Sequence, residues 1–129
     1  METLIIGGKT TRLHSNAATP IRYKTIFKKD LMIEISKMQK GESSESEIYE
    51  LPGKLAFIMN MQAEKTKEEL GKLSEEDYYS WLEDFEGAMC FVDKTTEIIS
   101  IYMGNVKGDS TSKKAEDLPS ESLTQQSIT

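Results

Sequence analysis

The most constraining feature of the sequence is a nearly unbroken apolar run in the middle of the chain. Leu51-Pro52 is typical of a helix start, and the apolar residues that follow are Leu55, Ala56, Phe57, Ile58, Met59, Met61 and Ala63. On a helix these residues go almost all the way round the axis, whereas a surface helix carries a single apolar stripe. We therefore predict a helix over residues 53–65 that is the most buried element of the fold.

The N-terminal residues predict a β-hairpin over residues 2–14. Two β-prone runs flank Gly7-Gly8, and a Gly-Gly pair is a recognised two-residue turn because glycine reaches the positive φ that such turns require. A two-stranded hairpin is only marginally stable by itself. We therefore expect this hairpin to pack on helices.

The segment after the hairpin is predicted to be helical over about residues 20–39, as one long helix or as two helices with a bend near Asp30. Thr19-Pro20 is typical of a helix start, because a hydroxyl can cap free amides and proline needs no amide at the first position. The polar residues Gly41–Glu47 that follow are predicted to be a loop. The apolar side chains of this helical segment share one face: Tyr23, Ile26, Phe27, Leu31, Ile35 and Met38.

Two more helices are predicted towards the C-terminus, over about residues 75–86 and 88–104. Ser74 precedes three acids, and carboxylates in the first turn are favoured by the helix dipole. Gly104 is a plausible helix end. The charged residues 64–72 are predicted to be a connection or a frayed helical end.

Residues 105–129 differ from the rest of the chain in composition. They contain eight Ser or Thr residues, no aromatic residue and four scattered large aliphatic residues. Such a segment cannot bury enough surface to offset the entropy of ordering it, so we predict a disordered, flexible polar tail. The predicted fold is thus α+β: a single domain over residues 1–104, with the N-terminal hairpin packed on a small bundle of about four helices.

The charge is distributed unevenly. The formal net charge is −6, but residues 1–40 hold eight basic and three acidic residues, whereas residues 41–100 hold five basic and fifteen acidic residues. The two regions attract each other within one fold, or they support self-association or binding of a charged partner. A net negative chain is a poor candidate for binding nucleic acid. No apolar run is long enough for a membrane span, no secretory signal is visible, and one Cys excludes a disulfide framework or thiolate zinc site.

No residue pattern indicates catalysis, a cofactor or a metal. Gly8-Lys9-Thr10 resembles the end of a phosphate-binding loop, but the glycine that this loop needs five positions earlier is replaced by Thr3. His14 and Cys90 lie in no nucleophile motif. The Glu-rich stretches lack the spacing of a calcium loop. We therefore predict a protein that is not an enzyme.

Several segments spread over most of the chain form a pattern known from one protein family. They are Leu4–Leu13 (LIIGGKTTRL), Ala17–Tyr23 (AATPIRY), Ile26–Leu31 (IFKKDL), the apolar helix Leu55–Ala63, Tyr79–Phe85 (YSWLEDF) and Ile101–Asn105 (IYMGN). In these segments the chain resembles the tail assembly chaperones of long-tailed phages and prophages of Gram-positive bacteria. The loop Gly41–Glu47 and the residues after Lys114 match nothing in that pattern.

The resemblance implies a non-enzymatic protein of the host bacterial cytoplasm that is not expected in the mature virion. Such a protein coats the tape measure protein and keeps that long, apolar, helical chain soluble until tail tube protein polymerises around it. Tail tube protein is therefore a second candidate partner. Family members are commonly made in a short form and in a longer form produced by ribosomal frameshift.

The frameshift implies a testable property of the gene. A slippery A-AAA-AAG heptamer encodes two lysines after a codon that ends in A. Phe27-Lys28-Lys29 cannot supply it, because no Phe codon ends in A, whereas Ser112-Lys113-Lys114 can. The prediction is a heptamer at Ser112, with an overlapping −1 frame downstream.

The residues predicted to contact the partner are large apolar side chains on the expected helices. Six of the seven Met residues also lie on these helices, where methionine packs the core or lines an adaptable groove. The alternatives to a tail assembly chaperone are a structural phage protein, namely a head–tail connector or tail completion protein, and a small acidic inhibitor module. The predicted contact surface consists of Phe57, Met61, Trp81, Phe85 and Tyr102.

Overall fold

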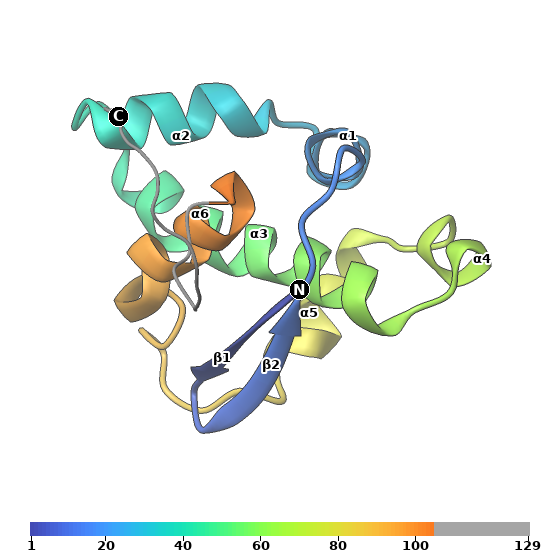
Figure 1. Cartoon of the computed structure of the whole chain (residues 1–129). Coiled ribbons are helices and arrows are strands. Elements are labelled where there is room, and N and C mark those ends of the chain that lie inside the picture. The colour runs from blue at the N-terminus through green and yellow to red at the C-terminus, as the bar shows by residue number, and fades with distance from the viewer. Residues whose placement is uncertain (105–129) are drawn as a thin grey trace, which may run out of the picture.

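The computed structural model describes residues 1–104, which form an N-terminal hairpin followed by helices (Figure 1). The hairpin consists of β1 (Glu2–Ile6) and β2 (Lys9–Leu13). The helices are α1 (Thr19–Phe27), α2 (Leu31–Gln39), α3 (Glu45–Glu64), α4 (Lys67–Leu70), α5 (Glu75–Leu82), the 3-10 turn η1 (Val92–Lys94) and α6 (Thr95–Met103). The predicted α+β fold with an N-terminal hairpin is confirmed, and six α-helices replace the expected four. The tail predicted over residues 105–129 lies outside the described residues.

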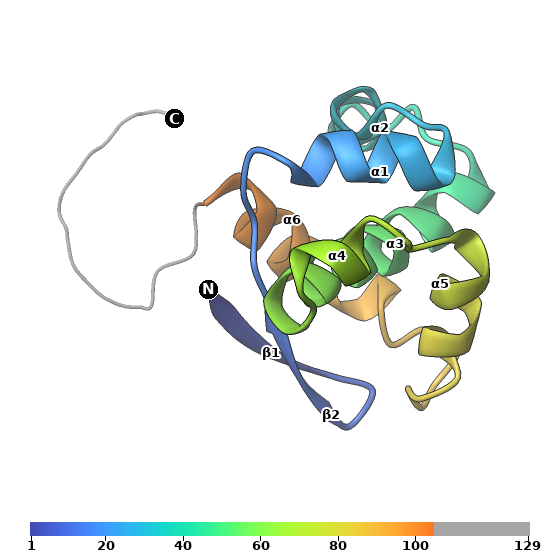
Figure 2. The same cartoon turned by 90° about the vertical axis from the view of Figure 1, so that its right-hand side faces the viewer.

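Helix α3 forms the axis of the domain. It contacts β2, α1, α2, α5 and α6, and Figures 1 and 2 show it between the hairpin on one side and α1 with α2 on the other. Residues 51–59 and Met61 are all buried. This element buries more residues than any other described helix, as its apolar run predicts.

The start of α3 differs from the prediction. The helix begins at Glu45 rather than near Gly53, so the expected loop over Gly41–Glu47 contains its first turn. Ser44 and Glu47 form a capping box: each side chain accepts a hydrogen bond from the backbone N–H of the other residue. Pro52 lies inside the helix. A proline there removes one amide donor, and the cap together with burial of the surrounding residues keeps the helix continuous.

The hairpin has the predicted turn. Ile6 pairs with Lys9, and Gly7 and Gly8 have φ values of 54° and 77°. Gly7 also lies so close to α5's C-terminal loop that a Cβ at this position would be 2.8 Å from the Glu86 carbonyl oxygen. The turn therefore needs glycine for both its conformation and its packing.

The chain divides into two helices near Asp30, which is the second of the two predicted forms. Lys28 adopts a left-handed conformation with φ of 62° and ends α1, and the Asp30 carboxylate accepts the Ile33 amide to cap α2. Thr19 does not cap α1 as expected. It is buried within the first turn, where its hydroxyl accepts hydrogen bonds from the Asn16 amide and Gln62 Nε2.

The last two predicted helices are shorter than expected. Helix α5 has the predicted start, with a capping box between Ser74 and Asp77, but it ends at Leu82 rather than at residue 86. The residues that follow include three acids, which oppose the negative end of the helix dipole. The expected helix over 88–104 becomes turns and η1, and α6 begins only at Thr95.

Helix α6 packs on the core through Ile98 and Ile101, which are buried, and through Ile99 and Tyr102, which are partly buried. The predicted connection over 64–72 contains the four-residue helix α4. Within residues 1–104, no helix is long and apolar enough to cross a membrane.

Candidate binding groove

A groove of about 420 Å³ lies where α3, α4 and α5 meet. Its apolar lining comes from Phe57 and Met61 of α3, Trp81 of α5 and Leu73 between α4 and α5. Charged side chains complete the lining: Lys65, Glu69, Lys72 and Asp77. Because polar and charged groups surround an apolar lining, the groove suits an apolar side chain presented by another polypeptide.

The aromatic side chains behind the groove hold its surface in place. The ring centroids of Phe57 and Trp81 lie 5.4 Å apart in an edge-to-face arrangement, and Trp81 lies 4.5 Å from Phe85 and 5.3 Å from Phe91. Trp81 Nε1 donates a 2.9 Å hydrogen bond to Asn60 Oδ1. The indole therefore has both its ring and its polar atom fixed.

Asn60 also connects the groove to the hairpin. Its Nδ2 donates to the Arg12 carbonyl oxygen at 2.8 Å while its Oδ1 accepts from Trp81. One amide thus ties α5 and β2 to α3. Apolar and polar residues alternate at the end of α3. Met59 and Met61 are buried in the core, whereas Asn60 and Gln62 donate hydrogen bonds to carbonyl oxygens at the end of β2 and just after it.

The segment that covers one side of the groove is attached weakly. Helix α4 has four residues, and none of them is buried. Only Leu70 and Leu73 of this segment pack on the core, and both are half-buried. A capping box between Thr66 and Glu69 defines the helix. Because this segment buries little apolar surface, opening it requires little free energy compared with unfolding the core.

The charged residues of the groove are not equivalent. Glu69 and Asp77 each accept a hydrogen bond from the backbone amide at the start of their own helix, at 2.9 Å from Thr66 and 2.9 Å from Ser74. The Thr66 amide lowers the pKa of the Glu69 carboxyl. The ammonium of Lys72 lies 3.9 Å from Glu68 in an exposed pair that contributes little. The carboxylates are thus committed to helix caps, and the lysines are more available to a bound chain.

The structure brings four of the five predicted contact residues together. Phe57, Met61 and Trp81 line the groove, and Phe85 lies against Trp81 with Lys9 Nζ 5.1 Å from its ring centroid. Tyr102 is elsewhere, on α6, where its hydroxyl lies 3.4 Å from Met32 Sδ.

The three apolar residues of α3 and α5 that line the groove have little surface accessible to a partner. Phe57 has no exposed surface, and Met61 and Trp81 are each 8% exposed. Sequence reasoning missed Leu73, Lys65, Glu69 and Lys72 because they lie in a segment without helical periodicity. The one available signal was the T-x-x-E pattern of Thr66 and Glu69, which is typical of a helix start.

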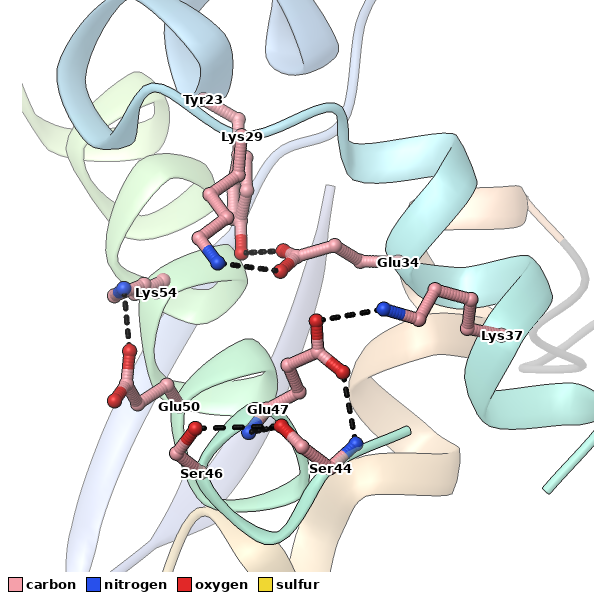
Figure 3. Close-up of polar contacts among 9 residues, drawn as sticks. All are labelled: Tyr23, Lys29, Glu34, Lys37, Ser44, Ser46, Glu47, Glu50 and Lys54. Atoms are coloured by element: carbon pink, nitrogen blue, oxygen red, sulfur yellow. Dashed lines mark hydrogen bonds and ion pairs between the residues drawn. The ribbon is translucent and has the colours of Figure 1, made fainter. Parts of the chain in front are cut away.

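A polar cluster between α1, α2 and the first half of α3 fixes α1 and α2 (Figure 3). Tyr23 donates a 2.6 Å hydrogen bond to Glu34, and Lys29 lies 4.0 Å from the same carboxylate. Burial raises the pKa of the Tyr23 hydroxyl, and the hydrogen bond to Glu34 adds to the increase. Tyr23 therefore stays protonated and remains a donor to Glu34.

Two further ion pairs complete this cluster. Lys37 lies 2.9 Å from Glu47 and joins α2 to the start of α3, while Lys54 lies 2.7 Å from Glu50 within α3 (Figure 3). The Ser44 amide, together with Lys37, lowers the pKa of Glu47 to about 2. Every carboxylate in the cluster is paired with a lysine or a helix cap, so we interpret the cluster as structural.

The candidate reactive residues are not assembled into a site. Cys90 is half-buried beside the hairpin turn, and burial raises the pKa of its thiol. The His14 backbone is tied to α3 through Met59 and Gln62. Among residues 1–104, no group of three or more His, Cys, Asp or Glu side chains could hold a metal ion.

Comparisons with known proteins add no relative. The sequence matches no protein-family model, and neither the curated proteins nor the solved structures yield a match.

Proposed function

We propose that this protein is a non-enzymatic tail assembly chaperone of a long-tailed phage or prophage, and that it binds apolar helical segments of the tape measure protein. The observation that carries the proposal is the groove between α3, α4 and α5, with its aromatic lining and its weakly attached cover. The family resemblance of the sequence supports the same function. Tail tube protein is a second proposed partner, and the proposed site of action is the host cytoplasm.

Binding proceeds by exchange in this proposal. The segment around α4 packs on the core through Leu70 and Leu73, and an apolar helix of the tape measure protein takes the place of these two side chains. Displacement would uncover Phe57, Met61 and Trp81, which are otherwise nearly inaccessible. In this proposal, Leu70 and Leu73 keep the apolar surface covered while no partner is bound.

The size of the groove sets the expected affinity. Burying one large aliphatic side chain contributes about 1.5–3 kcal/mol, whereas a micromolar complex requires about 8 kcal/mol. One or two side chains seated in a single groove therefore give weak binding. Many copies along one long tape measure chain provide the coating, and weak individual contacts allow the tail tube to displace them.

Trp81 allows a direct test, because it is the only tryptophan in the chain and it lines the groove. Tape measure segments without tryptophan are titrated into the full chain while indole emission is recorded. We expect a saturable spectral change, and we expect co-expression to keep the segments soluble. L73E introduces a charge into the groove lining and should abolish both effects.

The matched control is I5E, which introduces the same charge at an exposed position of the hairpin. Both variants must keep the far-ultraviolet circular dichroism of the wild type. If L73E protects the tape measure segments as well as I5E does, the groove is not the binding site. Mass spectrometry of purified virions tests the wider function: a chaperone is absent from mature particles, and a connector or completion protein is present.

A further inference from the structure

A second groove lies between α1 and the start of α2, away from the α3–α4–α5 groove. It has a volume of about 290 Å³ and is lined by Pro20, Ile21, Lys24, Thr25, Asp30 and Leu31. We call it the α1–α2 groove. Figure 2 shows α1 and α2 together at the top of the molecule, with α5 at the lower right.

The apolar part of the α1–α2 groove is exposed without a partner among residues 1–104. Ile21 is 67% exposed and is the most exposed large hydrophobic residue in this part of the chain. Met32 and Ile33, at the start of α2, are 45% and 58% exposed. The Tyr102 hydroxyl of α6 lies 3.4 Å from Met32 Sδ.

The charged part of the groove is basic. Ile21, Lys24 and Thr25 lie at helical spacing on one face of α1, and Lys28 follows as the left-handed residue that ends the helix. Neither Lys24 nor Lys28 has a carboxylate within 4.0 Å in the described part of the chain. Lys28 Nζ donates a 2.7 Å hydrogen bond to the Thr25 carbonyl oxygen, which keeps its charge beside the groove.

The one acidic residue in the lining, Asp30, offsets part of this positive charge but lies within 4.0 Å of neither lysine. The Asp30 carboxylate accepts the Ile33 amide at 3.1 Å as the cap of α2. Lys29, the next basic residue, lies 4.0 Å from Glu34 and is already paired. Lys24 and Lys28 thus carry two positive charges against the one negative charge of Asp30, beside the exposed Ile21.

We propose that the α1–α2 groove binds an acidic amphipathic helix of a partner protein. Apolar side chains of that helix would pack on the exposed Ile21 and Met32, and carboxylates on the same face would pair with Lys24 and Lys28. This surface is separate from the groove proposed for the tape measure protein, and the proposal does not depend on that function.

Helix α5 of a second copy fits this groove less well than a separate helix does, whereas the acidic start of α3 has exposed Ile48 and Tyr49 and is covered by the self-association test below. The carboxylates of α5 are in its first turn, and the apolar side chains that follow them, Tyr78 and Trp81, are buried. Tyr79 alone provides a large exposed apolar group beside these acids, at 55% exposed. A helix that matches the groove needs apolar and acidic side chains on one accessible face.

The test uses two labelled designed peptides of about 18 residues, a length at which isolated helices begin to be stable. Both carry leucines on one helical face, and the flanking residues are Glu in one peptide and Lys in the other. Fluorescence anisotropy with the full chain should show the acidic peptide binding at least about tenfold more tightly than the basic one at low salt. Binding should weaken as salt screens the lysines.

Two charge-reversal variants locate the binding. K24E/K28E should weaken binding of the acidic peptide by about tenfold or more, and I21S should weaken it as well. The matched control is K65E/K72E, which reverses two lysines of the α3–α4–α5 groove and should change the affinity by less than about twofold. L73E, which tests the proposed tape measure site, should also leave this binding unchanged.

Several outcomes would overturn the proposal. Equal binding of the two peptides would show that charge is not recognised. Retained binding by K24E/K28E, or loss of binding in K65E/K72E, would place the acidic peptide elsewhere. Sedimentation equilibrium of the full chain measures self-association. If the chain self-associates and K24E/K28E abolishes this, a second copy rather than a separate partner occupies the groove.

Discussion

Helices α3 and α4 begin with the same local device and contribute very differently to the domain. Ser44 with Glu47 starts α3, and Thr66 with Glu69 starts α4, each through a reciprocal capping box. Ten of the 20 residues of α3 are buried, whereas none of the four residues of α4 is. A capping box therefore defines where a helix starts, and burial determines how strongly the helix is held.

The same difference separates stability from function in the proposed mechanism. The α3 side chains that line the binding groove also hold the core, so they cannot move without unfolding it. The α4 segment can move because it is held by two half-buried leucines. The substitutions below test this division, beginning with the largest expected effect.

F57A should produce the largest loss of stability. Phe57 is fully buried and packs against Trp81 and Tyr78 at ring-centroid distances of 5.4 and 5.5 Å. Removing a buried phenylalanine side chain costs about 3–5 kcal/mol, and urea unfolding measures the change. L70A, in the α4 segment, should cost much less than F57A. Similar losses for the two variants would contradict the division between α3 and α4.

Y23F should have the next largest effect, because it leaves a buried carboxylate without its donor. Tyr23 is fully buried and its 2.6 Å hydrogen bond reaches Glu34, which is 8% exposed. An unsatisfied buried polar group costs about 1–3 kcal/mol, to be measured by urea unfolding. The double variant Y23F/E34Q serves as the control, since a neutral side chain should recover part of the loss. A Y23F protein as stable as the wild type would show that the bond contributes nothing.

The two capping boxes should respond differently to the same change. S44A should lower the global free energy of unfolding by about 1 kcal/mol, the usual loss for an N-cap. T66A should change it by less than about 0.5 kcal/mol, because α4 can open without the core. Hydrogen exchange should show faster exchange confined to the α4 segment in T66A. A global loss in T66A equal to that in S44A would mean that α4 is part of the cooperative core.

E47Q should have the smallest effect and a characteristic pH dependence. The Ser44 amide and Lys37 lower the pKa of Glu47 from an ordinary 4.5 to about 2. The ionised carboxylate thus contributes stability above about pH 4.5, and this contribution is lost as the pH falls towards 2. Glutamine can still accept the Ser44 amide, so E47Q should be less stable at neutral pH and should lose less stability between pH 4.5 and 2. Parallel wild-type and E47Q stability curves over this range would refute the assignment.

Much of the fold could be predicted because it follows from local chemistry. The Gly7-Gly8 turn, the α5 start at Ser74 and the Gly104 helix end each depend on the conformation or hydrogen bonds of a few neighbouring residues. The central position of α3 followed from its apolar side chains, since a helix that is apolar on all sides must be enclosed. Helix ends were less predictable. Pro52 indicated a start that a capping box eight residues earlier overrides.

The candidate site was predictable only in part. Phe57, Met61 and Trp81 were chosen as large apolar residues on predicted helices, and the structure brings them into one groove with Phe85 beside it. Tyr102 lies at a different surface because it belongs to α6, where its hydroxyl contacts Met32 of α2. Residues 88–94 form turns and η1 rather than an α-helix, so apolar spacing counted from residue 88 does not continue into α6.

The sequence by itself determined the α+β class, the hairpin turn and the burial of the central helix, because these depend on backbone conformation and on side chains that cannot remain in water. Only the tertiary contacts establish which aromatic residues meet, that Asn60 joins β2, α3 and α5, and that α4 flanks the groove without being buried. These features depend on contacts between residues far apart in the chain. No local pattern encodes such contacts, since they form only when α3 has been enclosed by its neighbours.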